Sequence, residues 1–475
     1  MQPSAFNVRV PLATGDVFLM NTLTDAQLVV SPDAARLVEQ PGETGASALN
    51  RAGEVLDALA TFADHGFLVQ DHASEQAALA RRFAEFREDT SQLRVTILTT
   101  LQCNFACSYC YQGDAADAGH PVPAMSLETS TQVAEWVAGR LDVVRPRRLV
   151  LTFFGGEPLL NTPAMFDLAE RCWLATQARG VRQLVNIITN GLLLSPEIVD
   201  RMLAFGLNGV KVTLDGDRVT HDRVRPARGG QGTFDRIIAN IGRVADRTPI
   251  AIGGNFDATT ADRYPALLDF LKGQEFAGRI SKVAFKPVIA PKSAQTPAGF
   301  IPLTAVGPER QPTNGSCMSV AGSGSSAGSA CDNCHFVDEQ MSMLREETKR
   351  RGFSTVDGVH MGPCELYRRH SHTIGPDGSL YACPGFTGDN AMAVGHIIAE
   401  HGGVQSDVAS RVERLAPWRQ CGDCSFIPVC GGGCAVASHA ELGDMEAPSC
   451  HKRAFESALI SLAEDAVGAT AGGLQ

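Results

Sequence analysis

The sequence has no long apolar run and no excess of basic residues. No stretch reaches the ~18 apolar residues of a membrane span, and the first residues lack a basic start followed by an apolar segment. We therefore expect a cytoplasmic protein that neither crosses nor enters a membrane. Its 41 Lys and Arg against 52 Asp and Glu give a formal net charge of -11, which repels a phosphate backbone. Nucleic acid is therefore not an expected partner.

The sequence also lacks the composition of a disordered chain. Charged residues make up 20% and apolar residues 44% of its 475 residues, which is enough to fill substantial cores. At ~100 to 200 residues per domain, the length predicts two to four domains. Fourteen cysteines remain to be explained. In a reducing compartment, clustered thiols more often ligate metal or do chemistry than form lasting disulfides.

Two differently patterned regions make up the first part of the chain. Residues 1–90 combine short alternating apolar runs, an amphipathic helix and a charged linker helix, which predicts a small α+β domain of winged-helix-like type. Residues 91–290 alternate six strands with helices, which indicates an α/β fold built from parallel βαβ units. The pattern fits a partial or complete barrel and an open doubly wound sheet equally well.

The second part of the chain has little periodicity. Residues 291–362 begin with a run rich in Pro, Gly, Ser and Thr, which predicts a flexible insertion or linker, followed by a short helix. Residues 363–475 include a segment dense in Cys and Gly. We expect this segment to fold around its ligands.

Three cysteines, Cys103, Cys107 and Cys110, are spaced C-x3-C-x2-C directly after the first strand of the α/β region. Three thiolates can hold three irons of a [4Fe-4S] cluster and leave the fourth iron open to an exchangeable ligand. The alternative is three core cysteines on one helical face, since offsets of four and seven share a face. The polar neighbours favour a loop over a core: Gln102, Asn104, Ser108 and Gln112.

This triplet resembles the signature of radical S-adenosylmethionine (SAM) enzymes. The resemblance implies a partial (β/α)6 barrel and a cluster whose open iron chelates the amino and carboxylate groups of SAM. Electron transfer, from a donor such as flavodoxin or ferredoxin, then yields methionine and a 5'-deoxyadenosyl radical. The resemblance does not identify a catalytic base.

The same resemblance assigns residues to SAM binding. Tyr109 occupies the aromatic position before the third cysteine, and the GGEP sequence at 155–158 resembles the motif whose carboxylate binds the SAM ammonium. Segments at the ends of the third and fourth strands resemble the family's TNG and SLDG sequences, with Thr213 in place of the usual Ser. The expected SAM contacts are Tyr109, Gly155, Gly156, Glu157, Pro158, Asn190 and Thr213.

Seven further cysteines, with Gly378 among them, resemble the SPASM domain of radical SAM peptide and protein maturases. The resemblance implies two auxiliary [4Fe-4S] clusters, which makes three in total. One would be held by Cys421, Cys424, Cys430 and Cys450, and the other by Cys364, Cys383 and Cys434. The alternative is a zinc ribbon, because CxxC pairs also bind zinc.

The second auxiliary set is one ligand short. Some families have an eighth cysteine six residues before Cys364, where this sequence has Gly358. Three cysteines in the insertion, Cys317, Cys331 and Cys334, could supply the ligand, bind a separate metal or stay free. A fourteenth, Cys172, lies on a predicted helix and is expected in the core.

The expected reaction is oxidation of a peptide side chain. We favour a maturase that forms a thioether in a Cys-containing peptide or small protein, with the quinohemoprotein amine dehydrogenase maturase type as one candidate. Carbon-carbon crosslinking is an alternative. An anaerobic sulfatase-maturase-like oxidase is another, although Pro384 stands where that group has an Asp, whose role Asp389 or another carboxylate could fill.

Two non-enzymatic classes also fit part of the pattern. A multicluster electron carrier would contain iron and sulfide without needing the GGEP sequence, and a zinc-structured binding protein would contain no iron. Residues 1–90 are either a peptide recognition domain or an ordinary cap.

Overall fold

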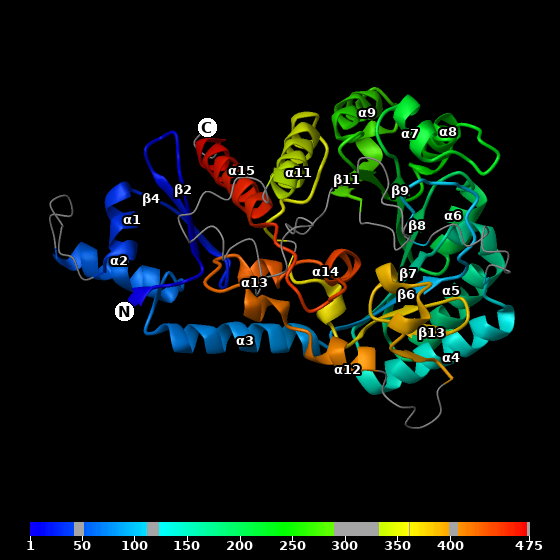
Figure 1. Cartoon of the computed structure of the whole chain (residues 1–475), viewed down its shortest axis with the longest axis horizontal. Helices are drawn as coiled ribbons and strands as arrows, with labels where there is room; N and C mark the ends of the chain where they lie inside the picture. Colours follow the sequence, from blue (N-terminus) through cyan, green and yellow to red (C-terminus); the bar gives the residue numbers. More distant parts are fainter. Residues whose placement is uncertain are drawn as a thin grey trace.

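The computed structural model describes residues 1–41, 52–110, 112, 123–288, 332–360, 362–398 and 407–472 (Figure 1). Every statement about the fold concerns these residues. No helix among them combines the length and the apolar character that a membrane crossing requires.

A parallel sheet forms the centre of the fold. Its six strands are β6 (Gln92–Leu98), β7 (Arg148–Phe154), β8 (Arg182–Thr189), β9 (Leu207–Thr213), β10 (Ile250–Phe256) and β11 (Ile280–Pro287). Each strand pairs in parallel with the next one along the chain. A doubly wound sheet reverses its strand order, whereas this one does not. The partial barrel is therefore confirmed and the doubly wound alternative is wrong.

Helices cover the outer face of this sheet: α4 (Leu127–Val144), α5 (Thr162–Gln177), α6 (Pro196–Leu203), α7 (Arg218–Val224), α8 (Phe234–Val244) and α9 (Tyr264–Lys272) (Figure 1). On β9, Val210 and Val212 are buried in the core beneath them. Because side chains alternate along a strand, Lys211 and Thr213 point to the opposite, inner face.

The cysteine-rich part of the chain extends the same sheet. Strand β12 (Ser371–Ile374) pairs in parallel with β6, and β13 (Ser379–Tyr381) and β14 (Gly395–His396) follow in antiparallel register. The helices of this part are α11 (Asp332–Arg350), α12 (Asp407–Arg414), α13 (Ile427–Cys430), α14 (Ala435–Leu442) and α15 (Lys452–Gly472). The barrel and the cysteine-rich part therefore share one nine-stranded sheet.

Short 3₁₀ helices connect many of these elements. They are η1 (Pro158–Asn161), η2 (Ala261–Arg263), η3 (Ala277–Arg279), η4 (Glu365–Tyr367), η5 (Pro384–Phe386), η6 (Asn390–Met392) and η7 (Pro417–Gln420).

The N-terminal part has the predicted α+β character. It consists of an antiparallel sheet of β2 (Asn7–Pro11), β3 (Val17–Asn21) and β4 (Ala26–Val30), a small pair of β1 (Gln2–Pro3) and β5 (Leu68–Val69), and helices α1 (Pro32–Glu39) and α2 (Ala52–Asp64). Phe18 and Met20 of β3 share a core with Val429 of α13 and Leu459 of α15. This part therefore packs on the cysteine-rich part.

The expected linker helix is α3 (His72–Glu88), which runs along the lower edge of the molecule in Figure 1. Asp71 caps it by accepting a hydrogen bond from the Ser74 amide at 2.7 Å. Leu79 and Phe83 are buried against Phe6 and Ile427, and the Phe83 ring stacks on Trp418 with the ring centroids 4.9 Å apart. The helix is therefore packed along its length and does not act as a loose connection.

Replacing Phe83 with Ala should lower the free energy of unfolding by about 3 kcal/mol, because truncating a buried aromatic ring leaves a cavity. Urea unfolding followed by tryptophan fluorescence measures the change. Leu174→Ala is the control, since Leu174 on α5 is 63% exposed and should change stability by less than about 0.5 kcal/mol. Equal effects of the two substitutions would contradict the packing role of α3.

Candidate active site

The predicted triplet lies in an irregular loop at the carboxyl end of β6. Cys103, Cys107 and Cys110 are not on a helix, so the alternative of a helical core face is wrong. The loop is held to the segment after α7, because the Ala106 amide donates to the Pro226 carbonyl at 2.9 Å and Arg228 Nε donates to the Cys103 carbonyl at 2.7 Å. Such loops at the carboxyl edge of parallel strands carry the chemistry of barrel enzymes.

The glycines at the end of β7 allow a close approach to this loop. The Gly156 amide donates to the Thr100 carbonyl at 3.0 Å, and the Glu157 amide donates to the Gln102 carbonyl at 2.8 Å. A Cβ atom on Gly156 would overlap the backbone of Gln102, and Gly155 has a φ of +134°. Only glycine fits both positions without moving the backbone that leads into Cys103.

The Glu157 carboxylate is completely buried and ties β7 to β8. It accepts hydrogen bonds from the Thr189 hydroxyl at 2.7 Å, the Asn190 amide at 2.8 Å and the Leu159 amide at 3.0 Å. Burial raises the pKa of this carboxyl, and the three hydrogen bonds oppose that effect. Its contact with the SAM ammonium stays a prediction. The structure adds a structural role that the motif alone does not indicate.

The other expected SAM residues gather at the same edge. The Asn190 side chain donates to Asn104 Oδ1 at 2.7 Å, one residue from Cys103. Pro158 begins η1 directly after Glu157, and Thr213 ends β9 with its side chain on the inner face. The structure therefore brings all seven predicted SAM residues to the carboxyl ends of β6 to β9, together with the cysteine triplet.

A buried polar network that the sequence did not predict supports Tyr109. The Tyr109 hydroxyl donates to Asp215 and accepts from Arg225, and Asn255 Nδ2 donates to it at 3.2 Å. Asp215 also accepts from the Asn255 amide at 2.7 Å. Because Arg225 and Asp215 are buried and form an ion pair, the tyrosine is fixed in one orientation beside the cysteine loop.

Arg225 also affects the pKa of the cysteine thiols. Burial raises the pKa of both Cys103 and Cys107 to about 11, and the Arg225 guanidinium opposes that shift. A buried thiol of this kind becomes a thiolate when a cation binds it. Three soft sulfur donors beside one buried guanidinium suit an iron-sulfur cluster.

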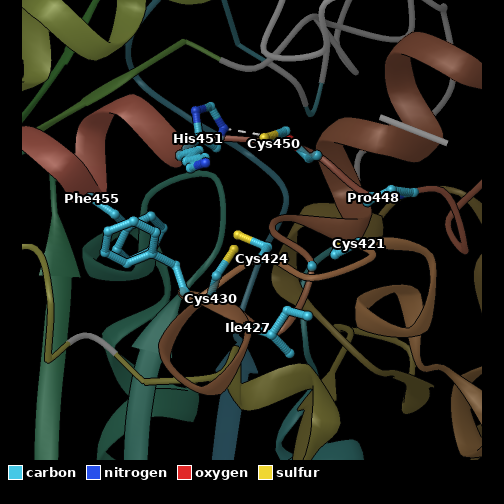
Figure 2. A pocket seen from close by; sticks show the side chains of 12 residues that line it. Cys421, Cys424, Ile427, Cys430, Pro448, Cys450, His451 and Phe455 are labelled. Carbon is cyan, nitrogen blue, oxygen red and sulfur yellow. Dashed lines mark hydrogen bonds between the residues drawn. The ribbon is translucent and has the colours of Figure 1, made fainter. Parts of the chain in front are cut away.

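Four cysteines of the C-terminal part line one pocket. Cys421, Cys424, Cys430 and Cys450 surround it, together with apolar residues such as Ile427 and Phe455 (Figure 2). Burial, followed by the charges of the other three cysteines, raises the pKa of the Cys421 thiol to about 12. The structure thus brings together the four residues that the resemblance assigned to one auxiliary cluster.

The second predicted set, Cys364, Cys383 and Cys434, is also brought together. Burial raises the pKa of Cys383 to about 12, and the nearby charges of Cys364 and Cys434 add to that effect. Tyr367 lies near cysteines of both sets. Burial, and then the charges of Cys364, Cys430, Cys421 and Cys434, raise the pKa of its hydroxyl. Its hydroxyl donates to the Gly431 carbonyl at 2.8 Å.

The position of the missing eighth cysteine is closed to a side chain. Gly358 has a φ of +88°, and a Cβ atom there would overlap the Arg345 guanidinium. A cysteine would therefore be strained at this position. Cys317, Cys331 and the side chain of Cys334 lie outside the described residues. Cys172 is fully buried in the core, as predicted.

No three His, Cys, Asp or Glu side chains of the described chain come together as a single bound metal ion requires. The choice between iron-sulfur clusters and the zinc alternative stays a prediction.

Comparison with known proteins agrees with this geometry. Residues 97–255, from β6 to β10, match the radical SAM superfamily. The chain contains a radical SAM domain. Such a domain works with a [4Fe-4S] cluster and SAM, which fits the cysteine triplet and the polar edge around it.

The similarity to curated relatives is partial. The AdoMet-dependent heme synthase of Methanosarcina barkeri is 34% identical over 143 residues, which cover 30% of this chain and 36% of that protein. The sporulation killing factor maturation protein SkfB of Bacillus subtilis is 27% identical over 168 residues, which cover 35% of this chain and 36% of that protein. The chain therefore spans about a third of the length of these relatives.

A solved structure described as native anSMEcpe with bound AdoMet has the same fold over a longer range. Its TM-score is 0.58 at 15% identity, and the match covers 78% of this chain and 99% of that one. The two chains therefore share their fold over this range.

Replacing Gly156 with Ala should lower the rate of SAM cleavage about tenfold or more, because the added methyl group displaces the backbone that leads into Cys103. Formation of 5'-deoxyadenosine by the anaerobically reconstituted protein measures this. Gly139→Ala on α4 is the matched control, since no atom lies within 4 Å of the Cβ that it would add. The close-approach argument fails if both variants cleave SAM at the rate of the unmodified protein.

Proposed function

We propose that this protein is a radical SAM maturase that forms a thioether between a cysteine sulfur and a carbon atom of a peptide or small protein. The observation that carries the proposal is the set of Cys364, Cys383 and Cys434. It supplies three thiols from the described residues, beside a radical SAM domain. A cluster held by three protein thiolates has one iron open to a substrate thiolate.

The chain's residues have the following proposed roles. Cys103, Cys107 and Cys110 hold the first [4Fe-4S] cluster, and Tyr109, Gly155, Gly156, Glu157, Pro158, Asn190 and Thr213 bind and orient SAM. When bound, the cluster and SAM supply a carbon-centred radical that removes a hydrogen atom from the substrate. Arg225 keeps a positive charge beside the buried thiolates, and Glu157 holds the ends of β7 and β8 together.

Two auxiliary [4Fe-4S] clusters complete the proposal. Cys421, Cys424, Cys430 and Cys450 form a full set of four ligands around one pocket, which suits electron transfer. The other set has three cysteines, and Gly358 stands where some families have a fourth, so one iron of this cluster is proposed to be open. An electron donor such as flavodoxin or ferredoxin is part of the proposal.

A peptide substrate is supported by the N-terminal part. Within the described chain, β4 pairs with β3 on one side only, so its other edge is available to a further strand. An extended peptide can add to such an edge through backbone hydrogen bonds. Val29 on β4 is 43% exposed and would contact it. Residues 1–90 are therefore proposed to recognise the peptide, residues 91–290 and 363–475 to modify it, and residues 291–362 to link these two parts.

The sulfatase-maturase-like alternative has less support. Pro384 begins η5, and Asp389 caps η6 by accepting a hydrogen bond from the Ala391 amide at 3.0 Å. Asp389 is thus engaged in local structure, whereas a base must be free to take a proton. Carbon-carbon crosslinking is the second candidate if a cysteine of the insertion occupies the open position.

Replacing Cys103, Cys107 and Cys110 together with Ala should remove one [4Fe-4S] unit and all reductive SAM cleavage. Iron counting and chromatographic detection of 5'-deoxyadenosine measure the two effects. Cys172→Ala is the control, because that thiol is buried in the hydrophobic core on α5. This substitution should leave both quantities unchanged. Continued 5'-deoxyadenosine formation by the triple variant would falsify the radical SAM mechanism.

Thioether formation predicts a product that is lighter by two hydrogens per crosslink and contains cysteines that alkylating reagents no longer label. Incubation of the reconstituted protein with SAM, a reductant and a library of Cys-containing peptides, followed by mass spectrometry, tests this. The same library with Ser in place of Cys should stay unmodified. Modification of the Ser library to the same extent would instead favour oxidation at carbon.

A further inference from the structure

Three lysines lie on the inner face of the barrel sheet. Lys211 of β9 and Lys282 of β11 are both in register with Ala251 of the intervening strand β10. Lys286 lies four residues farther along β11, in register with Asn255. Side chains at the same register position of adjacent strands share a face. The three ammonium groups therefore belong to one surface of the lumen.

The Lys211 side chain lies along this surface toward the carboxyl ends of the strands. Its Nζ atom is 3.1 Å from the position that a Cβ atom on Gly253 would occupy, two residues beyond Ala251. Gly253 thus gives the lysine room to lie flat over β10. Burial, and then the charges of Lys286 and Lys282, lower the pKa of Lys211 to about 8. Positive charge is therefore concentrated in this part of the lumen.

No Asp or Glu of the described chain forms a salt bridge with any of these lysines. Lys211 is half-buried, whereas Lys282 and Lys286 are exposed on the same face. The buried Arg225 is paired with Asp215. A half-buried ammonium such as that of Lys211 is unfavourable without a counter-ion, and such groups mark binding sites more often than structural ones.

One of these lysines, Lys286, lies near both cysteine sets that the proposed reaction uses. Asn255, opposite Lys286, donates to the Tyr109 hydroxyl in the loop of the first triplet. The charge of Lys286 acts on the Cys383 thiol of the second set. An anion held by the lysines would therefore lie in the space where the proposed substrate carbon and sulfur meet.

We propose that Lys211, Lys282 and Lys286 bind a carboxylate of the substrate, so that the peptide segment in the barrel is acidic. This inference rests on the proposed function, because it takes the lumen to be the substrate site. The carboxylate is that of an Asp or Glu side chain or of the peptide's C-terminus. Lysine ammonium groups contact such anions by charge-assisted hydrogen bonds.

The test uses two fluorescent synthetic peptides that contain Cys and differ in having Glu or Gln at the same positions. Each is made with a free and with an amidated C-terminus. Binding to the reconstituted protein is measured by fluorescence anisotropy without reductant, so that no turnover is needed. The variant is Lys282→Gln with Lys286→Gln, and the matched control is Lys272→Gln at the end of α9, on the outside of the barrel.

The double variant should bind the Glu peptide about tenfold more weakly than the unmodified protein and the control variant do, and the difference should shrink as salt is added. If the double variant also binds the amidated Glu peptide more weakly, the lysines contact the side-chain carboxylate. If its affinity falls only for the peptides with a free C-terminus, they contact the C-terminal carboxylate. Equal binding of all peptides by all proteins would overturn the inference.

SAM is itself a carboxylate, so its affinity is measured in parallel. The inference is supported if the double variant keeps its SAM affinity and its rate of 5'-deoxyadenosine formation. It is overturned if the variant loses SAM affinity while its peptide binding is unaltered. Absence of SAM cleavage in the unmodified protein would reject the proposed function instead. Because peptide binding is measured without turnover, the two failures are distinguishable.

Discussion

The contact between two backbone segments, residues 100–102 and residues 155–157, is the one on which the rest of the site depends. It brings the loop of Cys103 against the end of β7, and it requires glycine at 155 and 156. The carboxylate of Glu157 extends the same contact to β8, where Asn190 reaches back to the cysteine loop. Three strand ends are thus held together by the chain's own hydrogen bonds at the loop that carries the thiols.

Much of this arrangement could be predicted from the sequence because it depends on local patterns. The six strands predicted over residues 91–290 are present as β6 to β11. The resemblance of the cysteine pattern to a known domain predicted two groups of C-terminal cysteines, and the structure brings the members of each group together. The GGEP sequence was predicted to bind SAM, whereas the contact of its glycines with the backbone of residues 100–102 was not predicted.

The remainder depends on contacts between residues far apart in the chain. No sequence pattern distinguishes Arg225 from a surface arginine. Only the fold shows that it is buried beside Asp215 and the cysteine loop. Lys211 and Lys282 are separated by β10 and by helices α7, α8 and α9, so their common register with Ala251 is visible only once the strand order is known. The role of Tyr367 between the two C-terminal cysteine sets has no local signal either.

The parallel pairing of β12 with β6 has a consequence for how the molecule is made. Residues 371–374 complete the hydrogen bonding of residues 94–97, so the first strand of the barrel keeps an unpaired edge until nearly four-fifths of the sequence has been synthesised. Contacts of such long separation form late and leave an open strand edge exposed in the meantime. The loop that carries Cys103 is therefore synthesised long before β12 covers the adjacent strand edge. Aggregation through this edge is the hazard that a cell producing this protein has to control.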